Sequence, residues 1–225
     1  MGLVLGQPII AKLNNGVMGL IVSNGLNSAN DRAALLVYRL SDGALLAEID
    51  TGVGSAVAPN GLSAPTTRDI DGNGTVDYVF AGDMQGNLWK FNLSAASPTA
   101  WDNVSNRMVL FTATDAGGTR QPITSAPALA RDPATFQLWV FFGTGRFLTV
   151  GDVATQTVQS MYGLKDAATP ITSRATELQQ RRIVVAGFSG GLPVRGFEPA
   201  SALTVGMRGW FIDLVAPPSP PGTPQ

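Results

Sequence analysis

The sequence feature that most constrains the fold is an internal repeat of three segments. Each segment opens with a proline and an apolar run, passes a turn, and continues into a second apolar run that ends at a glycine. The glycine lies 17 residues after the proline in two copies (Pro8 to Gly25, Pro65 to Gly82) and 16 residues after it in the third (Pro127 to Gly143). Such a repeat indicates one supersecondary unit per copy, and the units bury their apolar faces by stacking.

A third apolar run follows in every copy. These runs end at Leu40, Leu93 and Leu164. In LWKFNL, Trp89, Phe91 and Leu93 alternate with Lys90 and Asn92, which is the period-2 pattern of a half-buried strand. Several strands in a unit of roughly 55–70 residues predict all-β propeller blades, although a plain β-sandwich remains the alternative.

Three units and a fragment are fewer than the roughly four to eight blades that close a ring, so we expect a modified, partial β-propeller of about three to four blades over residues 1–215. The fragment is GWFIDL at 209–214, which resembles the third strand of a unit. We expect it to be an exposed sheet edge. TELQQRR at 176–182 could form a short helix, and the proline-rich segment 216–225 is expected to be a flexible tail.

The composition excludes several classes of function. With no cysteine and no histidine, the chain cannot form disulfides, thiolate sites, Ser-His-Asp triads or the common zinc sites. The formal net charge of −1 argues against nucleic acid as a partner. No apolar run approaches the roughly 20 residues of a transmembrane helix, and the first residues, MGLVLGQPIIAKL, lack the basic start and the cleavage site of a signal peptide. For a protein that works outside the cytoplasm, we expect the export signal to lie upstream.

The strongest chemical motif is DIDGNGTVD at 69–77. Asp69, Asp71 and Asn73 occupy positions 1, 3 and 5 of a calcium loop, and Gly74 supplies the sharp turn at position 6. Thr75, at position 7, would offer its backbone carbonyl, and Asp77, at position 9, would close the cage directly or through water. Such a loop wraps a hard cation with six to eight oxygen ligands. We therefore predict one bound Ca²⁺ ion.

The flanks of this loop differ from those of an EF-hand. Position 12 is Phe80 instead of glutamate, and the neighbouring segments are strand-like. The repeat places the loop at the turn between the first and second strands of the middle unit, where the other copies carry LNNG and RDPATFQ. The motif therefore predicts a metal site in one hairpin at the rim of the array, not a helical calcium sensor. The Asn-rich segment from Ser23 is a weaker candidate for an ion or sugar site.

Several segments together resemble the C-terminal domain of the PilC/PilY family of type IV pilus tip adhesins and assembly factors. They are QPIIAKLNNG, SNGLNSAND, the stretch from Ile49 to Leu93, GTGRFLTVGD and GWFIDL. The resemblance implies a modified β-propeller whose calcium loop controls pilus extension and retraction on a protein that also mediates attachment. It maps the loop ligands onto the five residues named above.

The family resemblance also implies partners and a location. The partners would be minor pilins or the pilus tip complex, with a host-surface receptor as a further partner. The location would be the cell surface, at the pilus tip or associated with the outer membrane. We expect no enzymatic activity. The alternatives are a quinone-dependent dehydrogenase propeller, which GDMQGNLWKFNL resembles, and a calcium-stabilised extracellular repeat such as an integrin-like propeller.

Overall fold

The computed structural model describes residues 1–4 and 6–215, without the side chains of residues 185, 186 and 193. The segment 216–225, expected from its sequence to be a flexible tail, lies outside the described residues. Within those residues, no helix combines the length and the apolar character needed to cross a membrane.

Each of the three repeats forms a four-stranded antiparallel sheet. The first sheet contains β1 (Ile9–Lys12), β2 (Met18–Ser23), β3 (Arg32–Arg39) and β4 (Leu45–Gly54). The second contains β5 (Leu62–Arg68), β6 (Tyr78–Asp83), β7 (Asn87–Asn92) and β8 (Arg107–Thr112). The third contains β9 (Ala128–Arg131), β10 (Leu138–Gly143), β11 (Gln159–Lys165) and β15 (Gly209–Leu214), with β12 (Gln179–Arg181) added at its outer edge. We call these sheets the first, second and third blades.

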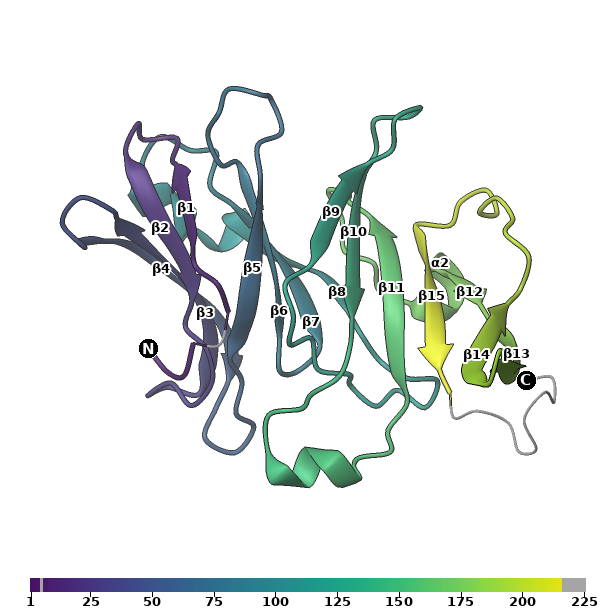
Figure 1. Ribbon diagram of the computed structural model, residues 1–225. Helices are drawn as coiled ribbons and strands as arrows, with labels where there is room; N and C mark the ends of the chain where they lie inside the picture. Colours follow the sequence, from purple (N-terminus) through teal and green to yellow (C-terminus); the bar gives the residue numbers. More distant parts are fainter. Residues whose placement is uncertain (5, 216–225) are drawn as a thin grey trace.

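The remaining elements are short. They are α1 (Pro98–Trp101), η1 (Val104–Asn106), η2 (Val150–Ala154), α2 (Arg174–Glu177) and the hairpin of β13 (Ile183–Ser189) with β14 (Leu192–Phe197). Figure 1 shows the three blades side by side, with the hairpins β1–β2, β5–β6 and β9–β10 directed to one rim at the top of the view. The sheets do not close into a ring within the described residues. The expected partial β-propeller is therefore confirmed.

Two apolar cores hold the blades together, and the middle blade contributes to both. In β6, Val79 and Ala81 face the first blade, whereas Phe80 between them faces the third. In β7, Trp89 and Phe91 again face the first blade, and Leu88 faces the third. This is the period-2 alternation of a strand that is buried on both faces. The predicted common face of Trp89, Phe91 and Leu93 is confirmed, but the predicted half-burial of the strand is wrong, because Leu88 on the opposite face packs against the third blade.

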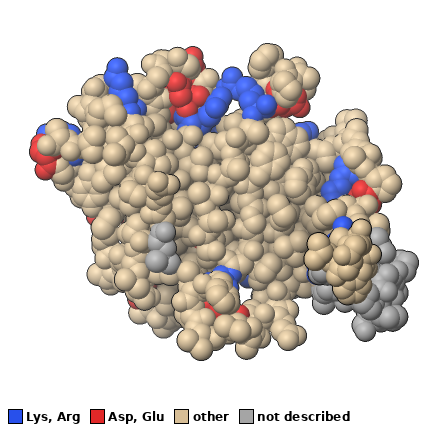
Figure 2. Space-filling model, viewed as in Figure 1, with Lys and Arg blue, Asp and Glu red and all other residues tan. Residues whose placement is uncertain are grey.

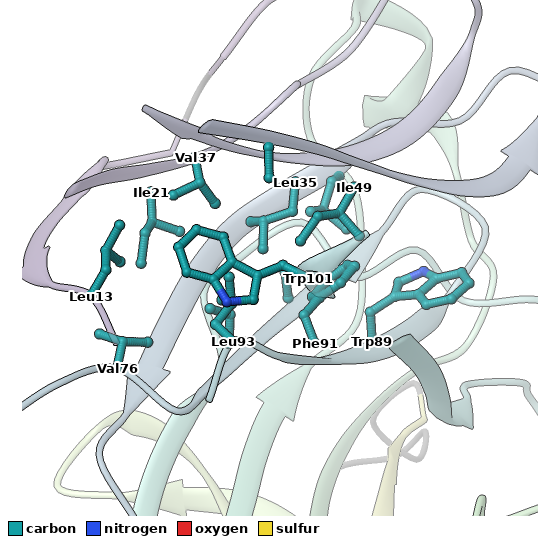
Figure 3. Close-up of a cluster of buried hydrophobic side chains, with 14 of the residues drawn as sticks. Leu13, Ile21, Leu35, Val37, Ile49, Val76, Trp89, Phe91, Leu93 and Trp101 are labelled. Atoms are coloured by element: carbon teal, nitrogen blue, oxygen red, sulfur yellow. The ribbon is translucent and has the colours of Figure 1, made fainter. Parts of the chain in front are cut away.

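The first of these cores lies between the first and second blades. Figure 3 shows Leu13, Ile21 and Leu35 of the first blade directed toward Val76, Phe91 and Leu93 of the second, with the indole of Trp101 between them. Trp101, in α1, is fully buried, and its indole N–H donates to the carbonyl of Ala95 at 2.8 Å. The segment after β7 therefore closes this core.

The fourth strand of each blade was not predicted from the sequence. For GWFIDL, the expected exposed sheet edge is wrong. This segment is β15, and it is the fourth strand of the third blade, not the start of another unit. It pairs with β11 antiparallel and with β12 in parallel, so it is not a sheet edge. The expectation failed because the chain from 166 to 208 returns and supplies β12. The predicted helix at 176–182 is also incorrect in extent, since α2 ends at Glu177 and residues 179–181 form β12.

The repeated glycine at the end of each second strand has a packing role that differs among the blades. A Cβ on Gly82 would lie 2.2 Å from Cγ2 of Ile123, whereas a Cβ on Gly143 would meet no atom within 4 Å. We expect Gly82→Ala to lower the free energy of unfolding by about 1–3 kcal/mol, because extra volume in a packed core forces shifts. Gly143→Ala is the matched control, with an expected change within about 0.5 kcal/mol. Urea denaturation measures both, and equal effects would contradict this packing role.

Candidate metal centre

The loop that carries the predicted metal ligands joins β5 to β6 at the upper rim of the molecule (Figure 1). Its base is closed by a hydrogen bond from the amide of Asp77 to the carbonyl of Arg68 at 3.0 Å. Gly72 and Gly74 have φ values of +81° and +83°, which residues with a side chain rarely adopt. The two glycines let the backbone turn sharply enough to bring both ends of the loop together.

The three carboxylates of the loop converge. Asp69, Asp71 and Asp77 each offer an oxygen, and these oxygens lie within 4.8 Å of one another. Asp71 is exposed, Asp69 is partly exposed, and Asp77 is buried, with 6% of its surface accessible. Within the described residues, Arg68 forms no ion pair with any of them, although it is adjacent in sequence. Three negative charges so close together repel one another unless a cation lies between them.

Backbone amides inside the loop orient these carboxylates. Asp69 accepts hydrogen bonds from the amides of Gly72 at 2.7 Å and Gly74 at 2.8 Å, and Asp77 accepts one from the amide of Ile70 at 2.8 Å. The Gly74 amide has the largest effect on the pKa of Asp69. Together with the amide of Gly72 it outweighs desolvation by burial and holds this pKa below its usual value. These amides therefore stabilise the ionised form of Asp69, which is the form that ligates a metal.

The other two predicted ligands belong to the same network. The side-chain amide of Asn73 donates to Asp71 at 2.9 Å, and its oxygen accepts from the amide of Thr75 at 2.8 Å and from the Thr75 hydroxyl. Phe80, at position 12, is fully buried in the core between the second and third blades and has no oxygen to offer in its side chain. The side-chain atoms that converge here and could ligate a metal are all oxygens. They fit a hard divalent cation such as Ca²⁺.

One residue of the site was not predicted from the sequence. Asn14 comes from the β1–β2 hairpin of the first blade, and its amide lies 3.3 Å from Asp77 and 2.8 Å from the carbonyl of Val76. The only signal in the sequence was that LNNG and the metal loop occupy equivalent turns of two repeats. That signal does not state which turns meet in space.

In the Asn-rich segment, which is the weaker candidate, one residue has a structural role. Asn24 is buried, donates to the carbonyl of Arg32 at 2.6 Å and accepts from the amide of Ala34 at 3.0 Å. It also accepts from the amide of Leu62 at 3.2 Å, so it joins the first blade to the second. The side-chain amide group and the side-chain oxygen of Asn24 are therefore both hydrogen-bonded within the protein.

The comparisons with known proteins agree on one family. The model of the PilY1 beta-propeller domain matches residues 1–183. A type IV pilus biogenesis factor PilY1 homolog of Xylella fastidiosa is 38% identical over 219 residues, which are 97% of this chain and 17% of that protein. The type IV pilus biogenesis factor PilY1 of Pseudomonas aeruginosa is 31% identical over 250 residues, covering 96% of this chain and 21% of its own length.

A solved structure shows the same architecture. The crystal structure of the Pseudomonas aeruginosa PilY1 C-terminal domain superposes with a TM-score of 0.82 at 28% sequence identity. The match covers 96% of this chain and 51% of that one. The chain thus spans about half of the solved domain and about a fifth or less of the two curated relatives.

Proposed function

This chain belongs to the PilY1 β-propeller family of type IV pilus biogenesis factors, and on that premise we propose that it is a calcium-binding propeller module of such a factor. The module binds one Ca²⁺ through Asp69, Asp71, Asn73, the carbonyl of Thr75 and Asp77. The observation that carries the proposal is the convergence of three carboxylates within 4.8 Å in one hairpin. The relatives are named as pilus biogenesis factors, which supports a role in pilus assembly.

The proposal extends to partners and location. The module acts at the cell surface, at the pilus tip or associated with the outer membrane, with minor pilins or the tip complex as partners and a host-surface receptor as a further one. The rim position of the metal loop supports this, because an ion and a partner can both reach it (Figure 1). Figure 2 shows charged side chains of both signs along the same rim and few on the face turned to the viewer.

We expect Asp69→Ala or Asp77→Ala to weaken calcium binding at least about tenfold, a loss of about 1.4 kcal/mol. The reason is that each substitution removes one carboxylate from the set that surrounds the ion. Calorimetric titration with CaCl₂ measures the affinity and the number of sites. The matched control is Asp132→Ala, in the β9–β10 hairpin, since Asp132 also accepts amide hydrogen bonds but belongs to no carboxylate cluster of the described residues.

Two outcomes of this titration would contradict the proposal. One is the absence of a calcium signal in the wild-type chain, and the other is an equal loss of affinity in the control. In cells that express the full-length protein, Asp69→Ala should change the number of surface pili and Asp132→Ala should not. An unchanged pilus number in the Asp69 variant would separate calcium binding from pilus assembly.

We also propose that the module is not an enzyme. The tryptophan in the segment that resembles a quinone-dependent dehydrogenase is Trp89, which is 4% exposed and packs in the core between the first two blades. Its indole N–H donates to Asp83 at 2.8 Å. This packing role supports a purely structural use of the motif. An absorption band that forms when a quinone cofactor is added to the calcium-loaded protein would favour the dehydrogenase alternative instead.

A further inference from the structure

One side chain of the first blade, that of Asn14, contacts the metal loop at several points. The amide nitrogen of Asn14 lies 2.8 Å from the carbonyl oxygen of Val76, 3.2 Å from that of Leu93 and 3.3 Å from a carboxylate oxygen of Asp77. Its side-chain oxygen lies 2.8 Å from the hydroxyl oxygen of Thr75, whose single proton is shared between Asn14 and Asn73. Asn14 therefore contacts the last three residues of the loop from a different blade.

Backbone contacts reinforce this junction. The amide of Val76 donates to the carbonyl of Lys12 at 3.0 Å, and Leu13 pairs with Val76 in a parallel bridge. Leu13 and Val76 are both buried in the core between the first and second blades. The other apolar residue of the loop, Ile70, packs against the core between the second and third blades. The loop thus has one apolar anchor in each of the two cores.

The contact with Asp77 links this junction to metal binding. Asp77 is the least exposed carboxylate of the cluster. The backbone amide of Ile70 donates to one of its oxygens, and the side-chain amide of Asn14 lies 3.3 Å from the other. Outer-shell partners that orient a metal-ligating carboxylate typically contribute about 10–100-fold to metal affinity. The position of Asn14 corresponds to such a partner, although it comes from the neighbouring repeat.

We propose that Asn14 is a positioning residue of the metal centre, through which calcium binding fastens the β1–β2 hairpin of the first blade to the loop of the second. The inference rests on the proposed calcium site. Coupling between two sites is reciprocal. If Asn14 strengthens calcium binding by orienting Asp77, calcium binding must in turn strengthen the contact of Asn14 with the loop. The first and second blades are then held together more firmly when calcium is bound.

The test compares Asn14→Ala with Asn15→Ala. Asn15 is the matched control, since it lies in the same turn and its side chain accepts only from the amide of Val17, at 3.3 Å, among the described residues. We expect Asn14→Ala to raise the calcium Kd about tenfold or more in calorimetry, and Asn15→Ala to leave it within about twofold. Hydrogen exchange of residues 12–17 is measured with and without CaCl₂. Calcium should slow this exchange in the wild type and in Asn15→Ala, but not in Asn14→Ala.

A second variant approaches the same contact from the loop. Thr75→Val removes the hydroxyl that contacts both Asn14 and Asn73 and leaves the backbone carbonyl of residue 75 in place. The effects of Thr75→Val and Asn14→Ala on Kd should be less than additive, because both changes break the contact between Asn14 and Thr75. A merely structural role of Asn14 would lower the melting temperature equally with and without calcium and leave Kd unchanged.

The outcomes separate this inference from the proposed function. If the wild-type chain does not bind calcium, both fail. If the wild type binds calcium but Asn14→Ala binds it equally well, the inference fails and the calcium site stands. Additive effects of the Asn14 and Thr75 substitutions on Kd would also overturn the inference.

Discussion

Asp83→Asn is expected to lower the free energy of unfolding by at least about 3 kcal/mol. Asp83 is fully buried, and five donors surround its carboxylate. The donors are the amides of Gln85 and Asn87, the side-chain amides of Asn60 and Asn87, and the indole N–H of Trp89, at 2.8–3.0 Å. An asparagine would turn an NH₂ group toward at least two of these donors. Each lost hydrogen bond to a charged group is worth about 1.5–3 kcal/mol.

The effect should extend across two blades, because one donor lies in the connection between them and another packs in the core that they share. Asn60 lies in the connection between β4 and β5, and Trp89 packs in the core that the first and second blades share. Chemical denaturation followed by tryptophan fluorescence measures the loss. The control is Asp115→Asn, since Asp115 also accepts two backbone amides, from Gly117 and Thr119, but is partly exposed, so that water replaces the lost bonds. Losses of the same size in both variants would contradict the role of burial.

Local patterns in the sequence were sufficient to predict the first three strands of each blade. The alternation in LWKFNL was sufficient by itself to assign Trp89 and Phe91 to one face of a strand. The same alternation is present in β4, where Ala47, Ile49 and Thr51 are buried on one face. That strand was not predicted because it follows the third run of its copy and takes no part in the proline-to-glycine spacing that marks the three copies.

The position of β15 could not be predicted from any local pattern. It pairs Gly209 with Leu164, across a segment that contains α2, β12 and a separate hairpin. Asn14 presents the same difficulty, because its amide reaches Asp77 only after two blades have packed. The ligand spacing of the metal loop is local and was therefore visible in the sequence. The residue that orients one of its ligands depends on tertiary contacts and was not.

Arg174, in α2, forms an ion pair with β15 that is largely shielded from solvent. Its guanidinium donates to both carboxylate oxygens of Asp213, in β15, at 2.7 and 2.8 Å, and lies over the ring of Phe211, 3.8 Å from the centroid. The two charged side chains are only 10% and 12% exposed. Asp213 also accepts a hydrogen bond from the hydroxyl of Ser160, in β11, at 2.6 Å. The ion pair therefore ties α2 to two strands of the third blade.

We expect Arg174→Met to lower the free energy of unfolding by about 3–5 kcal/mol, because it leaves the carboxylate of Asp213 buried without its partner. Part of this loss comes from the contact with the Phe211 ring, which contributes about 0.5–2 kcal/mol. The double variant Arg174→Met/Asp213→Leu should recover most of the loss, since a buried ion pair replaced by apolar side chains of similar volume is often close to neutral. Urea denaturation of the two single variants and the double variant gives the coupling energy. A double variant that is as unstable as the sum of the single variants would mean that the two charges do not stabilise each other.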